Sequence, residues 1–221
     1  MIEARGAALI YRDHGREVAA CRDLDVTIAP GEFVGILGPS GSGKSSLLYL
    51  LSGLKQPSHG EVRYEGKVVS AMPDGERANL RLRDFGFVFQ QPYLLGYLTA
   101  LENVALAGGP DGSAGGSDPG SLLENLGLGD KLHRYPHELS GGERQRVCVA
   151  RALFGEPKVI FADEPTAALD HRNGVQVVEL LNRHRGRGAL VMVTHDPSML
   201  EHADRILRIE DGAVVDEIAH S

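Results

Sequence analysis

The stretch from residue 38 to residue 45 limits the possible folds more than any other part of the chain. Its residues are Gly38, Pro39, Ser40, Gly41, Ser42, Gly43, Lys44 and Ser45. They fit the pattern G-x-x-x-x-G-K-S/T, with an apolar run at 33–37 before them and a helical pattern at 46–54 after them. Glycines let successive backbone N–H groups turn inward around phosphate oxygens, and the amino end of the following helix adds positive potential. The stretch therefore predicts a strand, a phosphate-binding loop and a helix, in that order.

Lys44 and Ser45, at the end of this loop, predict how a nucleoside triphosphate is held. The Lys44 ammonium group would rest on the β- and γ-phosphates, and the Ser45 hydroxyl would be a ligand of Mg²⁺. A glycine-rich turn that matches the pattern by accident is the alternative interpretation. The strand before the loop and the helix after it favour nucleotide binding over that alternative.

Three apolar runs, at residues 33–37, 159–162 and 190–193, lack any alternation of apolar and polar residues. Continuous runs of this kind are typical of strands buried on both faces of a parallel sheet. Polar residues follow each run directly. We therefore expect a parallel sheet with its chemistry at the carboxyl edge, where open α/β sheets bind their ligands.

Three other pairs of short runs are separated by turn residues, which predicts β-hairpins. The pairs are residues 26–28 with 32–37, 61–64 with 67–69, and 206–210 with 213–215. Residues 93–154 have a helical pattern, interrupted at residues 108–120, where six of thirteen residues are glycine. We expect this interruption to be a surface loop without packing capacity of its own.

These patterns together predict an α/β fold of the P-loop NTPase (RecA-like) class. Its parallel-sheet core would carry an antiparallel β subdomain and an inserted helical subdomain. The expected ATP-binding core with its β subdomain consists of residues 1–90 and 155–221. The expected helical subdomain consists of residues 91–154.

Asp163 and Glu164 are adjacent carboxylates directly after a predicted buried strand. Two neighbouring carboxylates repel each other unless a cation or a proton relieves them. Solvation of a loop after the strand is the alternative explanation for this pair. In a chain that also has a phosphate-binding loop, the two acquire separate tasks. Asp163 would hold the Mg²⁺ shell through water, and Glu164 would polarise the water that attacks the γ-phosphate.

A second glycine-rich element, at residues 139–145, precedes a helical run. Ser140 and Glu143 have the spacing of a capping box, which by itself predicts an ordinary helix start. That interpretation leaves Gly141 and Gly142 unexplained, because each glycine in a helix costs about 1 kcal/mol. The pair is explained if a ligand approaches the bare backbone closely.

The order of these elements resembles that of an ABC transporter ATPase subunit. The matching features are the phosphate loop, Gln90 after a strand, residues 139–142, Asp163 with Glu164, residues 168–170 and residues 194–196. In finer detail, residues 87–90, 94–104 and 162–166 resemble the group that serves lipoprotein release, macrolide export, haem export and cell division. The membrane partners in that group are FtsX-like permeases. The resemblance covers nearly the whole chain.

The resemblance implies a head-to-tail homodimer with two ATP molecules held between its subunits. Each phosphate loop would face the signature segment of the other subunit, which consists of Ser140, Gly141, Gly142 and Glu143. Backbone donors and a helix dipole would then point at a γ-phosphate that the other subunit holds. This arrangement would explain the pair of glycines.

The resemblance also implies roles for single residues. Tyr11 would stack on adenine, and the alternative is a tyrosine at a strand end that packs on the core. Gln90 would sense Mg²⁺ and link the site to the permease, while Asp170 would order the dimer seam. His195 would touch the γ-phosphate and position the attacking water, and Ser46, where many members have threonine, completes the ATP-binding set. The expected cofactors are ATP and Mg²⁺, the expected metal-binding residues are Ser45, Gln90 and Asp163, and the expected catalytic residues are Lys44, Glu164 and His195.

The predicted function is that of an ATP-binding and ATP-hydrolysing subunit that powers a membrane ABC transporter. The group resemblance favours an exporter or a mechanotransmission complex with an FtsX-like permease. An importer ATPase is an alternative, because it shares these motifs. A soluble ABC-type ATPase that acts on DNA or ribosomes is a second alternative. A small-molecule P-loop kinase is a third, although residues 139–145 have no task in a kinase. The transported substrate and the identity of the permease stay open.

Charge and hydropathy limit the partners further. The net charge of −7 argues against nucleic-acid binding, which needs a basic face. No segment approaches the roughly 18 consecutive apolar residues that span a bilayer, and the first residues contain no apolar signal core. We expect a cytoplasmic protein, peripheral on the inner face of the cell membrane, whose membrane contact is indirect through the permease.

Overall fold

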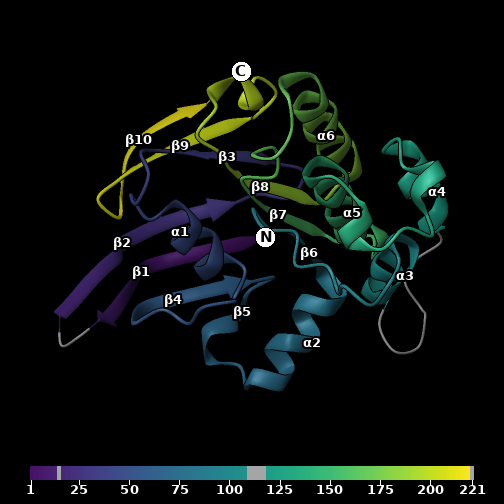
Figure 1. Cartoon of the computed structure of the whole chain (residues 1–221). Coiled ribbons are helices and arrows are strands. Elements are labelled where there is room, and N and C mark those ends of the chain that lie inside the picture. The colour runs from purple at the N-terminus through teal and green to yellow at the C-terminus, as the bar shows by residue number, and fades with distance from the viewer. Residues whose placement is uncertain (14–15, 109–117, 220–221) are drawn as a thin grey trace. The chain divides into compact units, whose positions relative to one another are not determined.

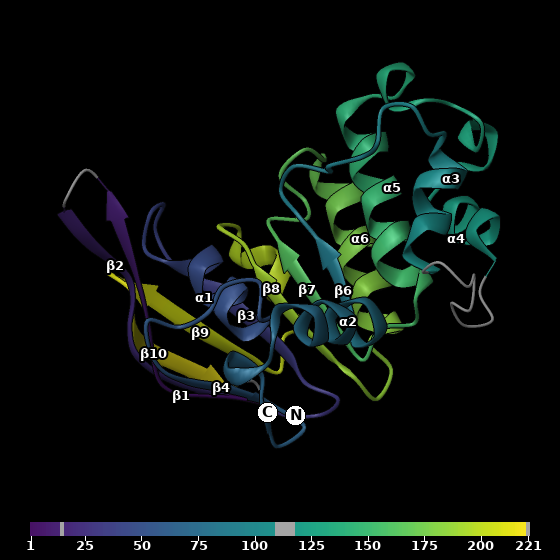
Figure 2. The same cartoon turned by 90° about the horizontal axis from the view of Figure 1, so that it is seen from below.

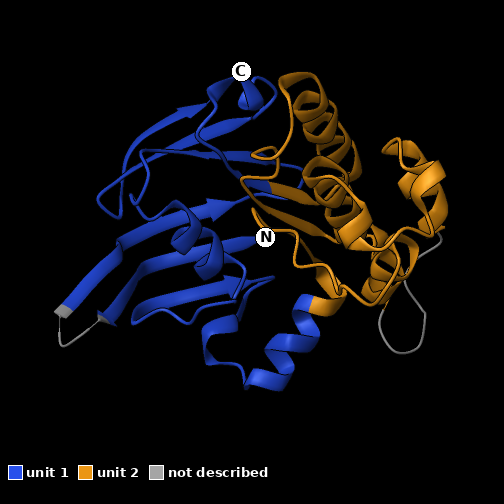
Figure 3. Ribbon diagram, viewed as in Figure 1, with its two compact units in different colours: residues 1–81, 191–221 blue, residues 82–190 orange. Residues whose placement is uncertain are grey.

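The computed structural model describes residues 1–13, 16–108 and 118–219 (Figure 1). The chain divides into two compact units, which Figure 3 colours separately. Unit 1 contains Met1–Arg81 and Val191–Ser221, and unit 2 contains Leu82–Leu190. The predicted helical subdomain, residues 91–154, lies within unit 2, which also contains residues on either side of it. Its boundaries therefore stay a prediction. In the described part of the chain, no helix has both the length and the apolar character that crossing a membrane requires.

Unit 1 contains a four-stranded antiparallel sheet in the order β2-β1-β4-β5. Its strands are β1 (Ile2–Asp13), β2 (Arg16–Ile28), β4 (His59–Tyr64) and β5 (Lys67–Val68). Val26 and Ile28 are buried and pair with Ala4 and Ile2 of β1, which are buried too, so one face of the sheet packs on the core. The pairing of β4 with β5 confirms the predicted hairpin at residues 61–69.

The long β1–β2 hairpin is not predicted by the patterns above. Shifts of register, typical of β-bulges, lie between Ala4 and Ile10 of β1. Each bulge moves the following side chains to the other face, so the alternation of apolar and polar residues is lost along this strand. Figure 1 shows β2, β1 and β4 side by side in unit 1.

The predicted hairpin of residues 26–28 with 32–37 is wrong. β2 pairs with β1, whereas β3 (Phe33–Leu37) pairs in parallel with β9 (Arg205–Glu210), with Val34 opposite Arg205. The tight turn is real, since the Glu32 N–H donates to the Ala29 carbonyl at 3.3 Å. The turn leads the chain from one sheet to another. β3 is buried along nearly its whole length, as a parallel strand that is covered on both faces must be.

Unit 1 also contains helices and the β-hairpin near the end of the chain. Helix α1 (Lys44–Leu51) begins at the end of the phosphate loop, and β9 pairs with β10 (Ala213–Ala219) in the third predicted hairpin, which is confirmed. Two short 3-10 helices cover Val69–Ala71 and Pro197–Leu200. Helix α2 (Asp74–Asp84), which the patterns above do not predict, contains the division between the units.

Unit 2 contains two parallel strands, β6 (Phe85–Val88) and β7 (Val159–Asp163), with Phe85 opposite Val159. Strand β8 (Ala189–Val193) crosses from unit 2 into unit 1. Every residue of β7 and β8 is buried, as predicted for the apolar runs at 159–162 and 190–193. Phe161 packs edge-on against Phe85, with ring centroids 5.2 Å apart. Parallel strands, helices and an antiparallel sheet confirm the predicted α/β fold class.

The helices of unit 2 pack around α5 (Gly141–Phe154), as Figures 1 and 2 both show. Its neighbours are α3 (Ala100–Ala105), α4 (Pro119–Asn125) and α6 (His171–His184). Short 3-10 helices cover Leu106–Gly108, Gly129–Lys131 and Pro136–Glu138. Residues 93–99 contain no helix, so the helical character predicted for residues 93–154 is confirmed only in the described segments from Ala100 onward.

The predicted glycine-rich loop at residues 108–120 needs a correction at both ends. Gly108 is buried at the end of a 3-10 helix, and Gly120 is buried in α4. Asp118 is the N-cap of α4, where its carboxylate accepts from the Ser121 N–H at 2.7 Å. Aspartate before proline is a strong helix start, and it outweighs the low helix propensity of glycine here. Residues 109–117 lie outside the described residues.

Candidate functional site

The phosphate loop joins the carboxyl end of β3 to the amino end of α1 in unit 1. Gly41 and Gly43 have φ angles of +79° and +101°, a region that glycine enters without steric cost. Gly43 is the N-cap of α1, and it has no side chain that could accept from the first N–H groups of the helix. The first turn also lacks acidic residues. The amino end of the helix therefore carries a positive dipole end that no acidic residue of the first turn offsets, which suits an anion.

The side chains of Lys44 and Ser42, in the same loop, also indicate a site for an anion. The Lys44 ammonium group is nearly buried and donates to the carbonyl oxygens of Gly38 at 2.9 Å and Pro39 at 2.7 Å. The Ser42 hydroxyl is buried and has no hydrogen-bond partner in the described structure. Buried polar groups normally find partners, so a buried hydroxyl without one, in the same loop as a buried lysine, suits a bound anion. This loop fits a phosphate.

His195 lies in the same unit as the loop. It follows β8 directly, and its neighbour Thr194 donates its N–H to the Ile36 carbonyl of β3 at 3.2 Å. Since Ile36 precedes the loop by two residues, the chain brings His195 to the edge of the sheet from which the loop departs. The His195 side chain is exposed. Its predicted contact with a γ-phosphate stays a prediction.

Tyr11 stands near the end of β1, also in unit 1. Its side chain is 38% exposed, which contradicts the alternative that it packs in the core. The Lys55 ammonium group lies 5.9 Å from the centre of the Tyr11 ring, close enough for a weak cation–π contact. The aromatic face is thus available at the surface, and stacking on adenine stays a prediction.

Asp163 and Glu164 end β7 in unit 2. Asp163 is the last residue of the strand and is only 4% exposed, whereas Glu164 is half-buried. Glu164 has a φ of +49°, in the left-handed region that residues other than glycine rarely adopt. Such strain, worth on the order of 1 kcal/mol or more, gathers at functional sites. The catalytic role of Glu164 stays a prediction, and its left-handed backbone is a feature that the sequence alone does not reveal.

The signature segment begins α5 in unit 2, and its capping box is confirmed. The Glu143 N–H donates to the Ser140 hydroxyl at 3.2 Å, and the Ser140 N–H donates to the Glu143 carboxylate at 2.7 Å. The backbone hydrogen bond from Ser140 lowers the pKa of Glu143, with further help from the Ser140 hydroxyl. Gly141 is exposed with open space around it. A methyl group at Gly142 would lie 3.1 Å from the Leu169 side chain, so a tight contact within the chain also favours this second glycine.

Gln90 is exposed two residues after the end of β6, and side chains of α5 contact the backbone on both sides of it. Gln145 is fully buried and donates its amide to the Phe89 carbonyl at 3.0 Å. Arg151 donates to the carbonyls of Pro92 at 2.8 Å and Tyr93 at 2.9 Å. Sequence reasoning missed both α5 residues. A polar side chain within the buried stripe of a helix is the signal that could have found Gln145.

Asp170 has a local structural task. It is the exposed N-cap of α6, where its carboxylate accepts from the backbone N–H and the side-chain amide of Asn173, at 3.0 and 2.5 Å. The hydrogen bond from the Asn173 backbone lowers the pKa of Asp170 most. Capping explains an aspartate here without any partner subunit. The predicted role at a dimer seam stays a prediction.

The structure thus brings the predicted residues together in two sets. Unit 1 holds the phosphate loop, Tyr11 and His195. Unit 2 holds Gln90, the signature segment, Asp170 and the acidic pair. The predicted Mg²⁺ donors, from both sets, are the hydroxyl of Ser45, the amide of Gln90 and the carboxylate of Asp163. These are hard oxygen ligands of the kind that Mg²⁺ prefers, so the residues present fit the ion.

Comparisons with known proteins found relatives that match nearly the whole chain. A family model described as "ABC transporter" matches residues 21–167. The chain is 45% identical to the "Uncharacterized ABC transporter ATP-binding protein MJ1508" of Methanocaldococcus jannaschii, over 99% of each chain. It is also 45% identical, over 97% of its length, to the "Macrolide export ATP-binding/permease protein MacB 1" of Aeromonas hydrophila, of which it spans 34%.

Solved structures show the same fold. With a TM-score of 0.90 and 35% identity, the chain matches the "Dimeric structure of a post-hydrolysis state of the ATP-binding cassette MJ0796 bound to ADP and Pi". The match covers 99% of this chain and 98% of that one. A second structure, described as the dimeric structure of MJ0796, a bacterial ABC transporter cassette, also has a TM-score of 0.90.

Proposed function

Since the chain belongs to the ABC transporter family, as an ATP-binding domain with ATPase activity, we propose that it powers a membrane transporter of the macrolide-export type. The observation that carries its nucleotide chemistry is the phosphate loop. A buried ammonium, an orphan hydroxyl and an uncapped helix start converge there. Each of these features favours a bound polyphosphate. The similarity to a cassette solved with ADP and Pi supports hydrolysis as the reaction.

The proposed reaction assigns a task to each of the predicted residues. The backbone of residues 38–45 and the Lys44 ammonium bind the β- and γ-phosphates, with Ser46 at the first turn of α1. Glu164 accepts the proton of the attacking water, and His195 orients that water toward the γ-phosphate. Ser45, Gln90 and, through water, Asp163 would hold Mg²⁺, which would supply positive charge to stabilise the leaving diphosphate.

We infer that the working unit is a head-to-tail homodimer bound to a permease of the FtsX-like type. Both similar cassette structures are described as dimeric, and the macrolide-export relative is described as an ATP-binding/permease protein. The exposed signature residues Ser140 and Gly141 would face the other subunit's nucleotide. The exposed rings of Tyr93 and Tyr97, at 66% and 75% exposure, offer the permease an apolar contact after Gln90. The proposed location is therefore peripheral on the cytoplasmic face of the membrane.

Lys44→Ala tests the phosphate loop. We expect loss of nucleotide binding and of ATP hydrolysis, because the buried ammonium is the only side-chain cation of the loop. Lys67→Ala, on the exposed strand β5, is the matched control and should behave as the wild type. Turnover at the wild-type rate in the Lys44 variant would refute the assignment.

The dimer and the permease need separate experiments. Glu164→Gln should bind ATP without hydrolysing it and should elute as a dimer in size-exclusion chromatography with ATP and Mg²⁺. In mixtures of Lys44→Ala and Ser140→Arg subunits, a mixed dimer keeps at most one intact composite site, so full activity would contradict shared sites. Purification from native membranes should recover a permease. Recovery of DNA or ribosomes instead would favour a soluble ATPase, and a permease of the importer type would reverse the direction of transport.

A further inference from the structure

The turn of the β9–β10 hairpin lies directly against the phosphate loop, and no predicted role accounts for it. Gly212, in this turn, donates its N–H to the carbonyl of Ser42 at 2.9 Å. Its own carbonyl accepts from the Arg22 N–H of β2 at 2.8 Å. One peptide segment therefore connects the loop to the antiparallel sheet. In both views the turn lies beside the chain between β3 and α1 (Figures 1 and 2).

The contact between turn and loop is one of backbone against backbone. A methyl group at Gly43 would lie 2.1 Å from the Ala20 carbonyl oxygen and 3.3 Å from the Gly212 Cα atom. A methyl group at Gly212 would lie 2.9 Å from the same Ala20 oxygen. Neither glycine can carry a side chain unless the loop, β2 or the turn moves. Three chain segments thus meet at a single carbonyl group.

The other end of the loop rests on the same hairpin. A methyl group at Gly38 would lie 2.2 Å from the carbonyl oxygen of Ile209, the residue of β9 that precedes the turn by two positions. The β9–β10 hairpin therefore supports the loop at Gly38 and again at Ser42 and Gly43. Between these points lie the backbone donors that must face the phosphates.

We propose that the β9–β10 turn is the rear support of the phosphate loop, and that Gly212 is a positioning residue for nucleotide binding. Gly212 touches the loop from behind, at the carbonyl of Ser42, so that the N–H groups of the loop stay directed at the phosphates. Precise placement matters there, because a shift of roughly 1 Å at a binding or reacting centre costs up to about 100-fold. The turn would act on affinity for nucleotide without touching the nucleotide.

The chain contains a matched control for this proposal. Gly66, in the turn between β4 and β5, has a φ of +76°, and Gly212 has a φ of +80°. Each follows an acidic residue with a left-handed backbone, Glu65 and Asp211. A methyl group at Gly66 would meet nothing within 4 Å. Alanine at either position therefore carries the same conformational cost, but only at Gly212 does it press on β2 and the loop.

The test compares Gly212→Ala with Gly66→Ala in the full chain. Isothermal titration with MgADP measures affinity without turnover, and steady-state kinetics separates the KM for ATP from kcat. We expect Gly212→Ala to weaken MgADP binding and to raise the KM about tenfold, with a smaller change in kcat. Gly66→Ala should stay within about twofold of the wild type. Equal affinities in the two variants would overturn the proposal.

A measurement on the wild-type chain covers the case in which Gly212→Ala does not fold. Coupling between two sites is reciprocal, so nucleotide that orders the loop must also stabilise the Gly212 N–H bond to Ser42. Amide hydrogen exchange, resolved by residue, should show slower exchange at Gly212 when MgADP binds. The Gly66 amide should exchange at an unchanged rate. Exchange at Gly212 that does not respond to MgADP would overturn the proposal.

Discussion

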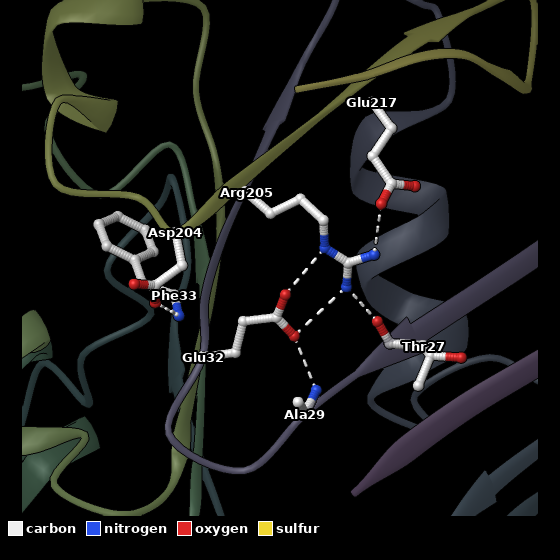
Figure 4. Close-up of polar contacts among 7 residues, drawn as sticks. All are labelled: Thr27, Ala29, Glu32, Phe33, Asp204, Arg205 and Glu217. Carbon is white, nitrogen blue, oxygen red and sulfur yellow. Dashed lines mark hydrogen bonds and ion pairs between the residues drawn. The ribbon is translucent and has the colours of Figure 1, made fainter. Parts of the chain in front are cut away.

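Replacement of Arg205 by methionine should destabilise unit 1. Arg205, at the start of β9, is the centre of the polar network in Figure 4. It donates to both carboxylate oxygens of Glu32 at 2.8 and 3.3 Å, to Glu217 at 2.9 Å and to the carbonyl of Thr27. Glu32 also accepts from the Ala29 N–H at 2.7 Å. These hydrogen bonds connect β9 and β10 to the turn between β2 and β3.

The size of the effect follows from burial. The Arg205 and Glu32 side chains are 17% and 15% exposed, so methionine would leave a mostly buried carboxylate without its cation. Breaking a buried pair in this way costs about 3–5 kcal/mol, and the residual exposure of both partners favours the lower end. Glu217 is 52% exposed, so its pair with Arg205 adds at most about 1 kcal/mol. We expect a loss of about 3 kcal/mol, which lowers the Tm by about 6–12 °C for a chain of this size.

Urea denaturation of Arg205→Met, with Arg208→Met as the control, measures this loss. Arg208 is on the same strand and lies 3.7 Å from Glu210, with both side chains 52% exposed, so its loss should cost under about 0.5 kcal/mol. A double-mutant cycle with Glu32→Gln should give a coupling energy of about 2 kcal/mol. Equal losses in the Arg205 and Arg208 variants, or a coupling energy near zero, would refute the reasoning.

Two further predictions concern unit 2. Burial alone would raise the pKa of Asp84, but its hydrogen bond with Arg83 and the charge of Lys158 outweigh burial and lower it. The carboxylate therefore stabilises the fold above the pKa of a free aspartate, about 3.9, and this stabilisation is lost as the pH falls through the lowered value. Asp84→Asn should cost about 1–2 kcal/mol at pH 7, because the partner cations are exposed and can hydrate. A cost that does not shrink in urea titrations as the pH is lowered below about 3.9 would contradict this. Asn103→Ala should cost about 2–3 kcal/mol by the same assay, because the buried amide holds the carbonyls of Leu95, Leu98 and Thr99, and a loss below about 0.5 kcal/mol would contradict it.

Local sequence patterns were sufficient to predict the structure wherever one short segment specifies its own conformation. The phosphate loop between strand and helix and the capping box of Ser140 and Glu143 are examples, and both lie where they were predicted. The turn at residues 30–31 shows the limit. A Pro-Gly turn is compatible with a hairpin and with a change of sheet, and the burial of β3 on both faces decides between them.

The candidate site shows the same division. Residue types and order were sufficient to identify Lys44, Glu164 and the signature segment as candidates. The left-handed backbone of Glu164 could be found only in the structure. The same holds for the hydrogen bonds that Gln145 and Arg151 donate to the carbonyls of Phe89 and Tyr93. A hydrogen bond between residues 56 positions apart leaves no periodic trace in the sequence.

By itself, the sequence determined the fold class and the nucleotide chemistry of this protein. Glycine spacing, one lysine and the start of a helix are local features, and local geometry is enough to form a phosphate nest. Only the tertiary structure decided what stabilises that nest from behind. Gly212 and Ser42 are 170 residues apart in the sequence. The carbonyl groups that Gly212 contacts are backbone groups, which every residue type has. Backbone contacts between distant segments depend on no particular side chain. The sequence therefore does not reveal them, and only the folded structure does.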